Sequence, residues 1–231
     1  MCALILGHFY FTYLGDYMKF AIFDVDLTLT KRDTFIDFYK FLCKEDKRFY
    51  AYLNNVIFSG LMYGIKIYDE RKSKEQYLSF LNGVHENVVD EFSRKFFYEH
   101  LMNKLIYKDA IIEIVKRKSE GYVIVLISAS PEFYLKYFNE LTYVDYVLGT
   151  KYEVVNGFYT GKMVGFNNKG KEKVFRFQEL LFRENIRDYD FDNSIMYSDS
   201  LHDLPMFGMV GSGFLINNSK RVNGLINLNW N

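Results

Sequence analysis

The chain has 231 residues, of which 49% are hydrophobic, enough for one large domain or for a core domain with an insertion. Its 29 basic and 29 acidic side chains cancel, and no basic stripe of the kind that follows a phosphodiester backbone stands out. This balance argues against nucleic acid as a partner. Two cysteines and four scattered histidines show no zinc-ligand spacing, so we expect a reduced, cytoplasmic protein.

The chain begins with an apolar segment. Residues 1–17 lack a basic start and carry His8 inside a short apolar stretch, which fits neither a signal peptide nor a membrane-spanning helix. A second start-like stretch, "MKF", follows at Met18. We therefore expect residues 1–17 to be an N-terminal extension or the result of a mis-assigned start.

A second apolar segment covers residues 49–65. It carries no charge, but Asn, Ser and Gly interrupt it, and it is shorter than the roughly 20 residues that a membrane-spanning helix needs. We expect two buried helices joined at a glycine. A surface that touches a membrane is the alternative.

Residues 33–100 are predicted to be helical almost throughout, because large apolar side chains recur at helical spacing, as in Phe35, Phe38, Tyr39 and Leu42. After Ile106 the pattern changes to an alternation of strands and helices. Strands are expected in "YVIVLIS", "VDYVLGT", "SIMYSD" and "VGSGFLI", helices in "DAIIEIVKRKSEG", "PEFYLKYFNEL" and "KEKVFRFQELLFREN", and a hairpin in "YEVVNGFYTGKM" about its Asn-Gly pair.

Together with a first strand at "FAIF", this alternation predicts an α/β fold with a doubly wound parallel sheet. The helical stretch interrupts the alternation directly after the first strand, so we expect it to be inserted as a lid over the sheet. Ligands of such sheets bind at the carboxyl ends of the strands. Polar residues follow three of the predicted strands there: Asp24 and Asp26; Ser128 and Ser130, on either side of Ala129; Ser198, Asp199 and Asp203.

Carboxylates packed this closely repel one another, and a hard cation relieves the repulsion. Mg²⁺ fits best, because it takes one or two carboxylates, several waters and a substrate phosphate oxygen. Asp24 and Asp199 are the candidate ligands. Asp24, the last residue of its strand, is also placed to attack phosphorus and form an aspartyl phosphate.

The remaining polar groups suit phosphoryl transfer. Asp26 can protonate the leaving oxygen and later accept a proton from water. Lys173, near the start of a predicted helix, can stabilise the phosphoryl oxygens together with the Ser128 hydroxyl and the backbone N–H groups of Val25 and Ala129. Ser130 precedes a proline, which predicts a helix N-cap whose helix points its N-terminus at the phosphate.

Four stretches in this order, "FDVDLTLT", "LISAS", a "KV" helix start and "YSDSLHD", resemble the motifs of the haloacid dehalogenase (HAD) superfamily over roughly Met18 to Leu215. More narrowly, "SASPEFY", "GFYTG", "KEKV" and "DSLHDLPM" resemble its phosphoserine-phosphatase-like branch, subfamily IB. The resemblance implies a Rossmann-like core formed by residues 18–32 and 106–231. Residues 33–105 are then an inserted α-helical cap, called the cap segment below.

The resemblance also implies roles for single residues. These are Asp24 as nucleophile, Asp26 as acid/base, Ser128 as phosphate binder, Lys173 as charge clamp and Asp199 as metal ligand. Further implied roles are the backbone carbonyl of Asp26 as a metal ligand, Asp203 orienting the metal waters or the lysine, and Asp33 receiving a substrate amine, with Arg71 or Lys74 available for a carboxylate. Leu27 and Ser198 depart from the family pattern, which often has a small residue at the first position and Gly at the second.

The expected function is a Mg²⁺-dependent phosphatase that hydrolyses a small phosphorylated metabolite through an aspartyl phosphate. A phosphotransferase or phosphomutase of the same fold is an alternative, since a hydroxyl acceptor changes little in these motifs. A catalytically silent protein that binds a ligand or associates with a membrane is another. The sequence leaves the substrate and the oligomeric state open.

Overall fold

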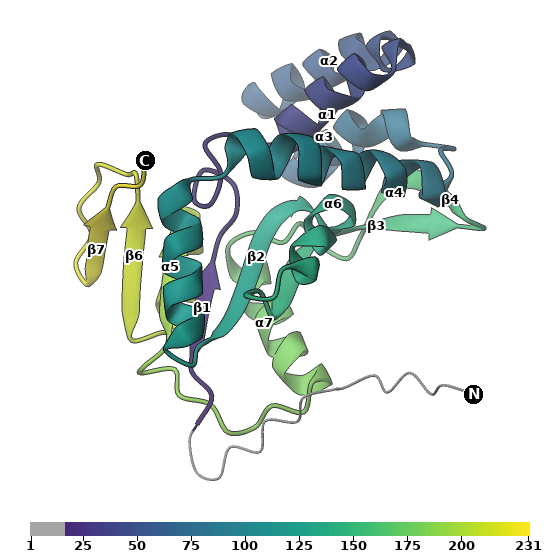
Figure 1. The fold of residues 1–231 in the computed structure, drawn as a ribbon. Coiled ribbons are helices and arrows are strands. Elements are labelled where there is room, and N and C mark those ends of the chain that lie inside the picture. The colour runs from purple at the N-terminus through teal and green to yellow at the C-terminus, as the bar shows by residue number, and fades with distance from the viewer. Residues whose placement is uncertain (1–16) are drawn as a thin grey trace, which may run out of the picture.

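The computed structural model describes residues 17–231, and a seven-stranded sheet lies at its centre (Figure 1). The strands are β1 Phe20–Phe23, β2 Val123–Pro131, β3 Tyr146–Val155, β4 Phe158–Val164, β5 Ile195–Ser198, β6 Ser212–Ile216 and β7 Leu225–Leu228. Their order is β4-β3-β2-β1-β5-β6-β7, and every neighbouring pair is parallel except the antiparallel β3 and β4. The predicted fold class is confirmed.

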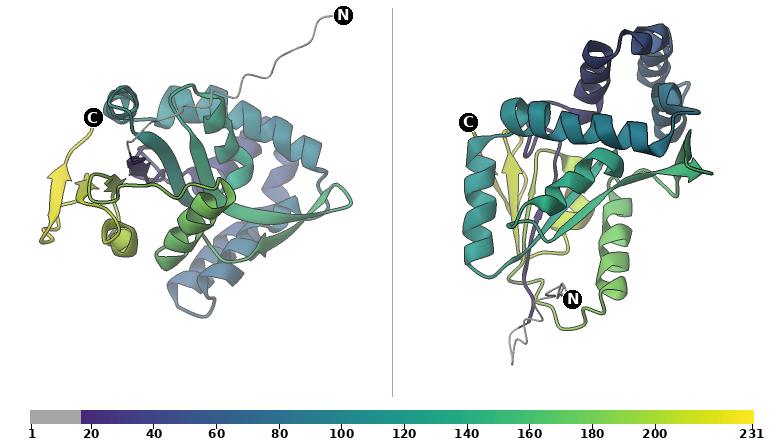
Figure 2. Two further views of the ribbon diagram at one scale, coloured as in Figure 1. Left: turned by 90° about the horizontal axis from the view of Figure 1, so that it is seen from below. Right: turned by 45° about the vertical axis from the view of Figure 1, so that its right-hand side comes forward.

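Helices cover both faces of the sheet. The helices are α1 Thr34–Glu45, α2 Leu53–Gly64, α3 Glu70–Tyr77, α4 Glu86–Lys95, α5 Lys108–Ser119, α6 Glu132–Leu135, α7 Lys171–Arg183 and α8 Leu204–Phe207. Figure 2 shows α5 and α7 on opposite sides of the strands. Ala21 and Phe23 of β1 pack in the cluster that contains α5, whereas Phe20 and Ile22 pack with Phe177 of α7. Strands buried on both faces explain why the first strand reads as an unbroken apolar run.

The cap segment lies over the carboxyl ends of the strands and contains α1 to α4 (Figure 1). The 3₁₀ turns Lys47–Tyr52 and Leu78–Leu81 lie between its helices, and a π-helical stretch, Phe96–Leu105, continues α4. The two connections between the core and the cap segment lie side by side. Thr30 and Ile106 form a β-bridge, and Lys31 N–H donates to the Leu105 carbonyl at 2.7 Å. The division of the chain at residues 33 and 105 remains our proposal.

The predicted hairpin is confirmed. It joins β3 to β4 through Asn156 and Gly157, with φ values of 50° and 82°. A two-residue hairpin turn of this kind needs positive φ at both positions, and Asn and Gly tolerate this conformation.

Other predictions differ from the structure. Residues 49–65 do not form two buried helices joined at a glycine, because α2 runs uninterrupted through Gly60 and Ser59 is its one buried residue. Ser130 does not cap a helix, since β2 continues through Pro131 and α6 has four residues and no side-chain cap. The last strand, β7, was not predicted, and the predicted extension, apart from Tyr17, lies outside the described residues.

Within residues 17–231, no helix combines the length and the apolar character that crossing a bilayer requires.

Candidate active site

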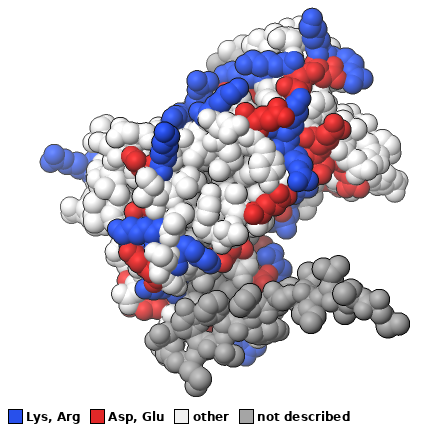
Figure 3. All heavy atoms as spheres, viewed as in Figure 1, with Lys and Arg blue, Asp and Glu red and all other residues white. Residues whose placement is uncertain are grey.

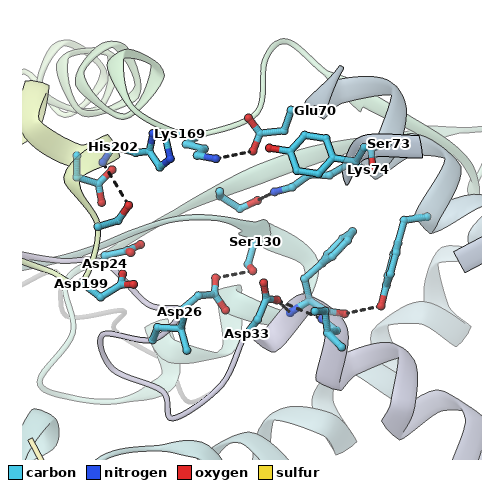
Figure 4. Close-up of a pocket in the computed structure, with 18 of the residues that line it drawn as sticks. Asp24, Asp26, Asp33, Glu70, Ser73, Lys74, Ser130, Lys169, Asp199 and His202 are labelled. Atoms are coloured by element: carbon cyan, nitrogen blue, oxygen red, sulfur yellow. Dashed lines mark hydrogen bonds and ion pairs between the residues drawn. The ribbon is translucent and has the colours of Figure 1, made fainter. Parts of the chain in front are cut away.

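A cavity of about 470 Å³ lies between the cap segment and the carboxyl ends of the central strands (Figure 4). Strand order reverses about β1, which is where an open parallel sheet binds its ligands. Asp24 follows β1 directly and Asp199 follows β5, and both line the cavity with Asp26 and Lys173. The structure therefore brings together the three carboxylates that the strand ends predicted and the lysine that the helix start predicted.

Lys173 is the centre of a buried ion-pair network. Its Nζ lies 2.8 Å from Asp24 Oδ1 and 2.7 Å from Asp203 Oδ2. Burial alone lowers the pKa of Lys173, but the charges of Asp24 and Asp203 outweigh it, so the pKa lies above its ordinary value. The ammonium is thus held in its charged form. Ser198 donates to the same Asp203 Oδ2 at 2.8 Å, which fixes the second carboxylate.

The negative charge of Asp24 is unfavourable in its buried position. Burial raises the pKa of Asp24 well above its ordinary value, in spite of the opposing charge of Lys173, and the neighbouring Asp203 and Asp199 add to the rise. One ammonium therefore does not balance the carboxylates around it.

Asp26 is fixed by four donors from two separate segments. Its Oδ1 accepts from the backbone N–H of Thr34 at 2.7 Å and from the Thr34 hydroxyl at 2.6 Å. Its Oδ2 accepts from Ser128 Oγ at 2.9 Å and from Ser130 Oγ at 2.6 Å. The Thr34 hydroxyl also lies 3.1 Å from the Tyr134 hydroxyl, which is fully buried. The first turn of α1 and the end of β2 thus determine where Asp26 points.

Ser128, Ala129 and Val25, the predicted phosphate binders, lie around the same site. The Ser128 side chain is fully buried behind the cavity wall, where it contacts Asp26 and accepts from Ser130 N–H at 2.9 Å, whereas Ala129 lines the cavity. The Val25 carbonyl accepts from the N–H groups of residues 28, 29 and 30, which shapes the loop after β1. Whether these groups bind phosphate remains a prediction.

Leu27 in that loop has a φ of 58° and lines the cavity. A left-handed conformation is costly for a side chain with a Cβ, so glycine would suit this backbone position better than leucine. The departure noted in the sequence therefore affects the loop and removes no polar group.

Asp33 also lines the cavity and has a structural role in addition. It is the N-cap of α1, where Oδ1 accepts from Phe35 N–H at 2.9 Å and from Ile36 N–H at 3.2 Å. Burial raises the pKa of Asp33 to about 6, and repulsion from Asp26 contributes. Its carboxylate is thus charged at neutral pH and faces the cavity from the cap side.

The two cap cations named in the sequence have different positions. Lys74 lines the cavity and donates to the Ala129 carbonyl at 2.7 Å and to Asn167 Oδ1 at 2.8 Å, and burial lowers its pKa. Arg71 does not line this cavity, because its guanidinium donates to the carbonyls of Met163 and Gly165 on the core. Of the two, Lys74 is the one available to a ligand.

The cavity wall carries further groups, from the cap segment and from the core, to which the sequence analysis assigned no role. Lys169 pairs with Glu70 across the cavity at 3.1 Å, and both lie opposite the three core carboxylates in Figure 4. Gly60, Tyr63 and Tyr77 supply apolar and aromatic surface. No sequence pattern marks these positions, since helical charges and aromatic residues are common on packed helices.

The donor set suits a hard cation. Asp199 Oδ1 accepts from the Thr28 hydroxyl at 3.3 Å, and burial raises the pKa of Asp199 although that hydrogen bond opposes the rise. Among residues 17–231, no three His, Cys, Asp or Glu side chains form a metal-holding group. Mg²⁺ does not require three, since one or two carboxylates with waters and a substrate oxygen complete its shell. The carboxylates of Asp24 and Asp199, whose negative charge Lys173 alone does not balance, therefore fit this ion.

The family model of haloacid dehalogenase-like hydrolases matches residues 21–208. The chain belongs to this family. Phosphoserine phosphatase SerB1 of Mycobacterium tuberculosis is 24% identical over 212 residues, which are 89% of this chain and 67% of that protein. The inhibition of morphological differentiation protein of Streptomyces azureus is 29% identical over 152 residues, covering 65% of this chain and 53% of its own length.

Solved structures show the same fold as this HAD-like hydrolase. A protein of unknown function from Bordetella pertussis superposes with a TM-score of 0.77 at 20% identity, over 88% of this chain and 92% of that chain. A phosphoserine phosphatase with a phospho-aspartyl intermediate analogue superposes with a TM-score of 0.60 at 18% identity, over 88% of each chain. The predicted superfamily is confirmed by the family model, and the prediction of a phosphomonoester hydrolase is confirmed.

Proposed function

We propose that this HAD-like hydrolase is a Mg²⁺-dependent phosphatase for a small phosphorylated metabolite and that Asp24 is its nucleophile. The observation that carries the proposal is the position of Lys173 Nζ between Asp24 Oδ1 and Asp203 Oδ2, beside Asp199 in a cavity large enough for a metabolite. This arrangement fixes one carboxylate at a strand end. It also places a permanent cation next to the atom that would attack.

In the first half-reaction, an oxygen of Asp24 attacks phosphorus. The new bond joins Asp24 to phosphorus, the bond to the ester oxygen breaks, and Asp26 gives its proton to that oxygen so that an alcohol leaves. In the second half-reaction, Asp26 takes a proton from water, the water oxygen forms a bond to phosphorus, and the bond between phosphorus and the Asp24 oxygen breaks, which releases inorganic phosphate and restores the Asp24 carboxylate.

The surroundings of Asp26 permit this exchange of a proton. The hydroxyls of Ser128 and Ser130 donate to Asp26 Oδ2, and each can rotate to accept instead when Asp26 is protonated. The backbone N–H of Thr34 donates in either state and keeps the carboxyl group in place.

Charge on the transferring phosphoryl oxygens would be stabilised by Lys173 and by the backbone N–H groups of Val25 and Ala129. The Ser128 hydroxyl would join them by turning from Asp26 Oδ2 toward the phosphate. Asp24, Asp199 and the backbone carbonyl of Asp26 would hold Mg²⁺. When bound, the ion would offset the negative charge that the transition state spreads over those oxygens. In this proposal Asp203 orients Lys173, in keeping with their contact.

The cap segment would select the substrate. Asp33, with a pKa of about 6, would receive an amine, and Lys74 a carboxylate, if the substrate is an amino-acid phosphomonoester. The relative named phosphoserine phosphatase supports this class. A cytoplasmic location belongs to the proposal as well.

The test is a screen of phosphorylated metabolites with Mg²⁺ that measures both inorganic phosphate and any phosphorylated acceptor. We expect free phosphate, loss of activity with a chelator, and no turnover by Asp24→Asn. A phosphorylated alcohol in place of free phosphate would indicate a phosphotransferase or mutase. If isothermal titration detects binding of a phosphorylated metabolite but no compound in the screen is turned over, the protein is catalytically silent.

A further inference from the structure

Asp199 is held in place by two loops that lie far apart in the sequence. Its backbone N–H donates to the hydroxyl of Thr28 at 2.8 Å, and that hydroxyl donates to Asp199 Oδ1 at 3.3 Å. Its backbone carbonyl accepts from Asn218 Nδ2 at 2.7 Å. Thr28 belongs to the loop after β1, whereas Asn218 follows β6. The two loops together therefore restrict where the carboxylate of Asp199 lies.

The side chain of Asn218 has a fixed orientation. Its Oδ1 accepts from Lys220 N–H at 2.9 Å, as in an Asx turn, which leaves Nδ2 as the atom that faces Asp199. The backbone carbonyl of Asn218 accepts from Asn227 Nδ2 at 2.6 Å, and the same amide donates to the Lys220 carbonyl at 2.9 Å. Asn227 is a residue of β7. The last strand thus holds the turn that carries the contact with Asp199.

Residues 217–231, called the C-terminal segment below, contact β5 at a second point. The buried ring of Trp230 lies with its centroid 5.9 Å from that of Tyr197, two residues before Asp199. Trp230 N–H donates to Asn217 Oδ1 at 2.8 Å, which ties the two parts of the segment together. The C-terminal segment is therefore packed against the strand that leads to Asp199.

The C-terminal segment offers no charged ligand of its own to a metal ion. Its charged residues are Lys220 and Arg221, and it contains no Asp, Glu or His. Figure 3 shows mostly uncharged surface at the edge of the molecule where Figure 1 places β6 and β7. Because Asn218 Oδ1 already accepts from Lys220, the amide acts on the site through the backbone of Asp199.

We propose that Asn218 is a positioning residue for the Mg²⁺ site, where its amide holds Asp199 in the position from which the carboxylate can ligate the ion. The inference rests on the proposed function, in which Asp199 is a Mg²⁺ ligand. Mg²⁺ demands near-ideal octahedral geometry, so a small displacement of a ligand weakens binding. Asn218 lies beyond residues 21–208, which the family model matches, so the motifs that include Asp199 do not mark it.

The experiment measures the affinity of the full chain for Mn²⁺, which prefers the same oxygen ligands, from the electron paramagnetic resonance signal of the free ion, with Mg²⁺ as competitor. We expect Asn218→Ala to weaken the binding of both ions about 10-fold, the lower end of what such supporting contacts contribute. Asn218→Ser should have a similar effect, because its hydroxyl can still accept from Lys220 N–H but is shorter than the amide that reaches Asp199.

The matched control is Asn217→Gly in the same segment. It removes the side chain that accepts from Trp230 N–H, and glycine suits the φ of 49° at this position. The control should bind Mn²⁺ like the wild type. Circular dichroism checks that each variant is folded, and Asn218→Ser decides if Asn218→Ala does not fold.

Turnover distinguishes positioning of a metal ligand from a general loss of structure. The Mg²⁺ concentration that gives half-maximal rate should rise about 10-fold in the Asn218 variants, whereas kcat at saturating Mg²⁺ should stay near the wild-type value. The inference is overturned if the folded Asn218 variants bind Mn²⁺ like the wild type, or if Asn217→Gly weakens binding as much as they do.

Asp199→Asn separates this inference from the proposed function. If Asp199→Asn loses Mn²⁺ binding and the Asn218 variants keep it, the positioning role is wrong and the metal site stands. If Asp199→Asn binds Mn²⁺ as tightly as the wild type, Asp199 is not a metal ligand, and both the proposed metal site and the inference are overturned.

Discussion

Lys173 Nζ contacts two buried carboxylates at once, Asp24 Oδ1 at 2.8 Å and Asp203 Oδ2 at 2.7 Å. Buried charges of one sign are tolerated only when an opposite charge accompanies them. The lysine therefore has a structural role in the same position where it can serve catalysis. The two roles can be separated by measuring stability and turnover in the same variants.

Replacing Lys173 by Met should destabilise the protein by about 3–5 kcal/mol, because both carboxylates lose their partner. Turnover should fall at least ~10²-fold through loss of the cation beside the phosphoryl group. Urea unfolding and phosphate release measure the two effects. Lys171→Met, an exposed lysine on the same helix turn, is the matched control and should change neither. Equal unfolding free energies and equal turnover in the two variants would show that Lys173 has neither role.

Thr34→Val should lower kcat about 10-fold with little change in KM, because the hydroxyl that holds Asp26 Oδ1 at 2.6 Å is lost while the volume is kept. The effect should be larger on an alkyl phosphate, whose leaving oxygen needs a proton, than on an activated aryl phosphate. Steady-state kinetics on both substrates check this. Thr160→Val, which removes an exposed hydroxyl from β4, should leave both rates unchanged. A uniform loss on both substrates would mean that Thr34 supports the fold rather than the acid.

Asp33→Asn should stabilise the protein at pH 8 but not at pH 4. In the folded state Asp33 keeps its proton up to about pH 6, whereas the unfolded chain loses it near the ordinary value of 3.8, so rising pH lowers the wild-type stability between these values. The variant escapes that loss, which amounts to about 1–3 kcal/mol, and Asn still caps the helix.

Urea unfolding at the two pH values measures the difference. Asp69→Asn is the control, since Asp69 caps α3 from an exposed position outside the cavity. A pH-independent difference between wild type and Asp33→Asn would show that the carboxylate is not held in its neutral form by burial.

Much of the site could be predicted because parallel strands end at one edge of a sheet. Asp24 and Asp199 each follow a short apolar run, and that local pattern was sufficient to bring them together. Lys173 needed the additional fact that a helix starts near the same edge.

The surroundings of Asp26 could not be predicted in the same way. Thr34, Ser130 and Tyr134 are common residue types in segments far apart in the sequence, and their contact depends on how α1 meets the end of β2. Ser130 before a proline had the pattern of a helix cap, but its hydroxyl binds Asp26 instead.

The exposure of α2 was missed for a related reason. An apolar sequence predicts burial, and the pattern contains no information on whether another element is present to cover it. In the structure Ser73 Oγ of α3 donates to the Ser59 carbonyl, which marks the side of α2 that is covered.

Asp26→Asn should separate the two half-reactions. With an alkyl phosphate, formation of the phosphoenzyme should slow by ~10²–10⁴-fold, because the leaving alkoxide receives no proton. An activated aryl phosphate needs no such proton, so the phosphoenzyme should form and then persist for lack of a base. A burst of phenolate ahead of slow turnover in stopped-flow measurements would show this, and equal losses on both substrates without a burst would make Asp26 a positioning residue.

The most direct test of the central claim is to identify the residue that carries phosphate. Asp26→Asn is mixed with an activated aryl phosphate and Mg²⁺, quenched in acid and digested, and the peptides are examined by mass spectrometry. We expect one phosphate on the peptide that contains Asp24. It should be sensitive to hydroxylamine, as an acyl phosphate is, and absent from Asp24→Asn/Asp26→Asn. Burst kinetics with phosphate on a different residue, or turnover by Asp24→Asn at the wild-type rate, would contradict it.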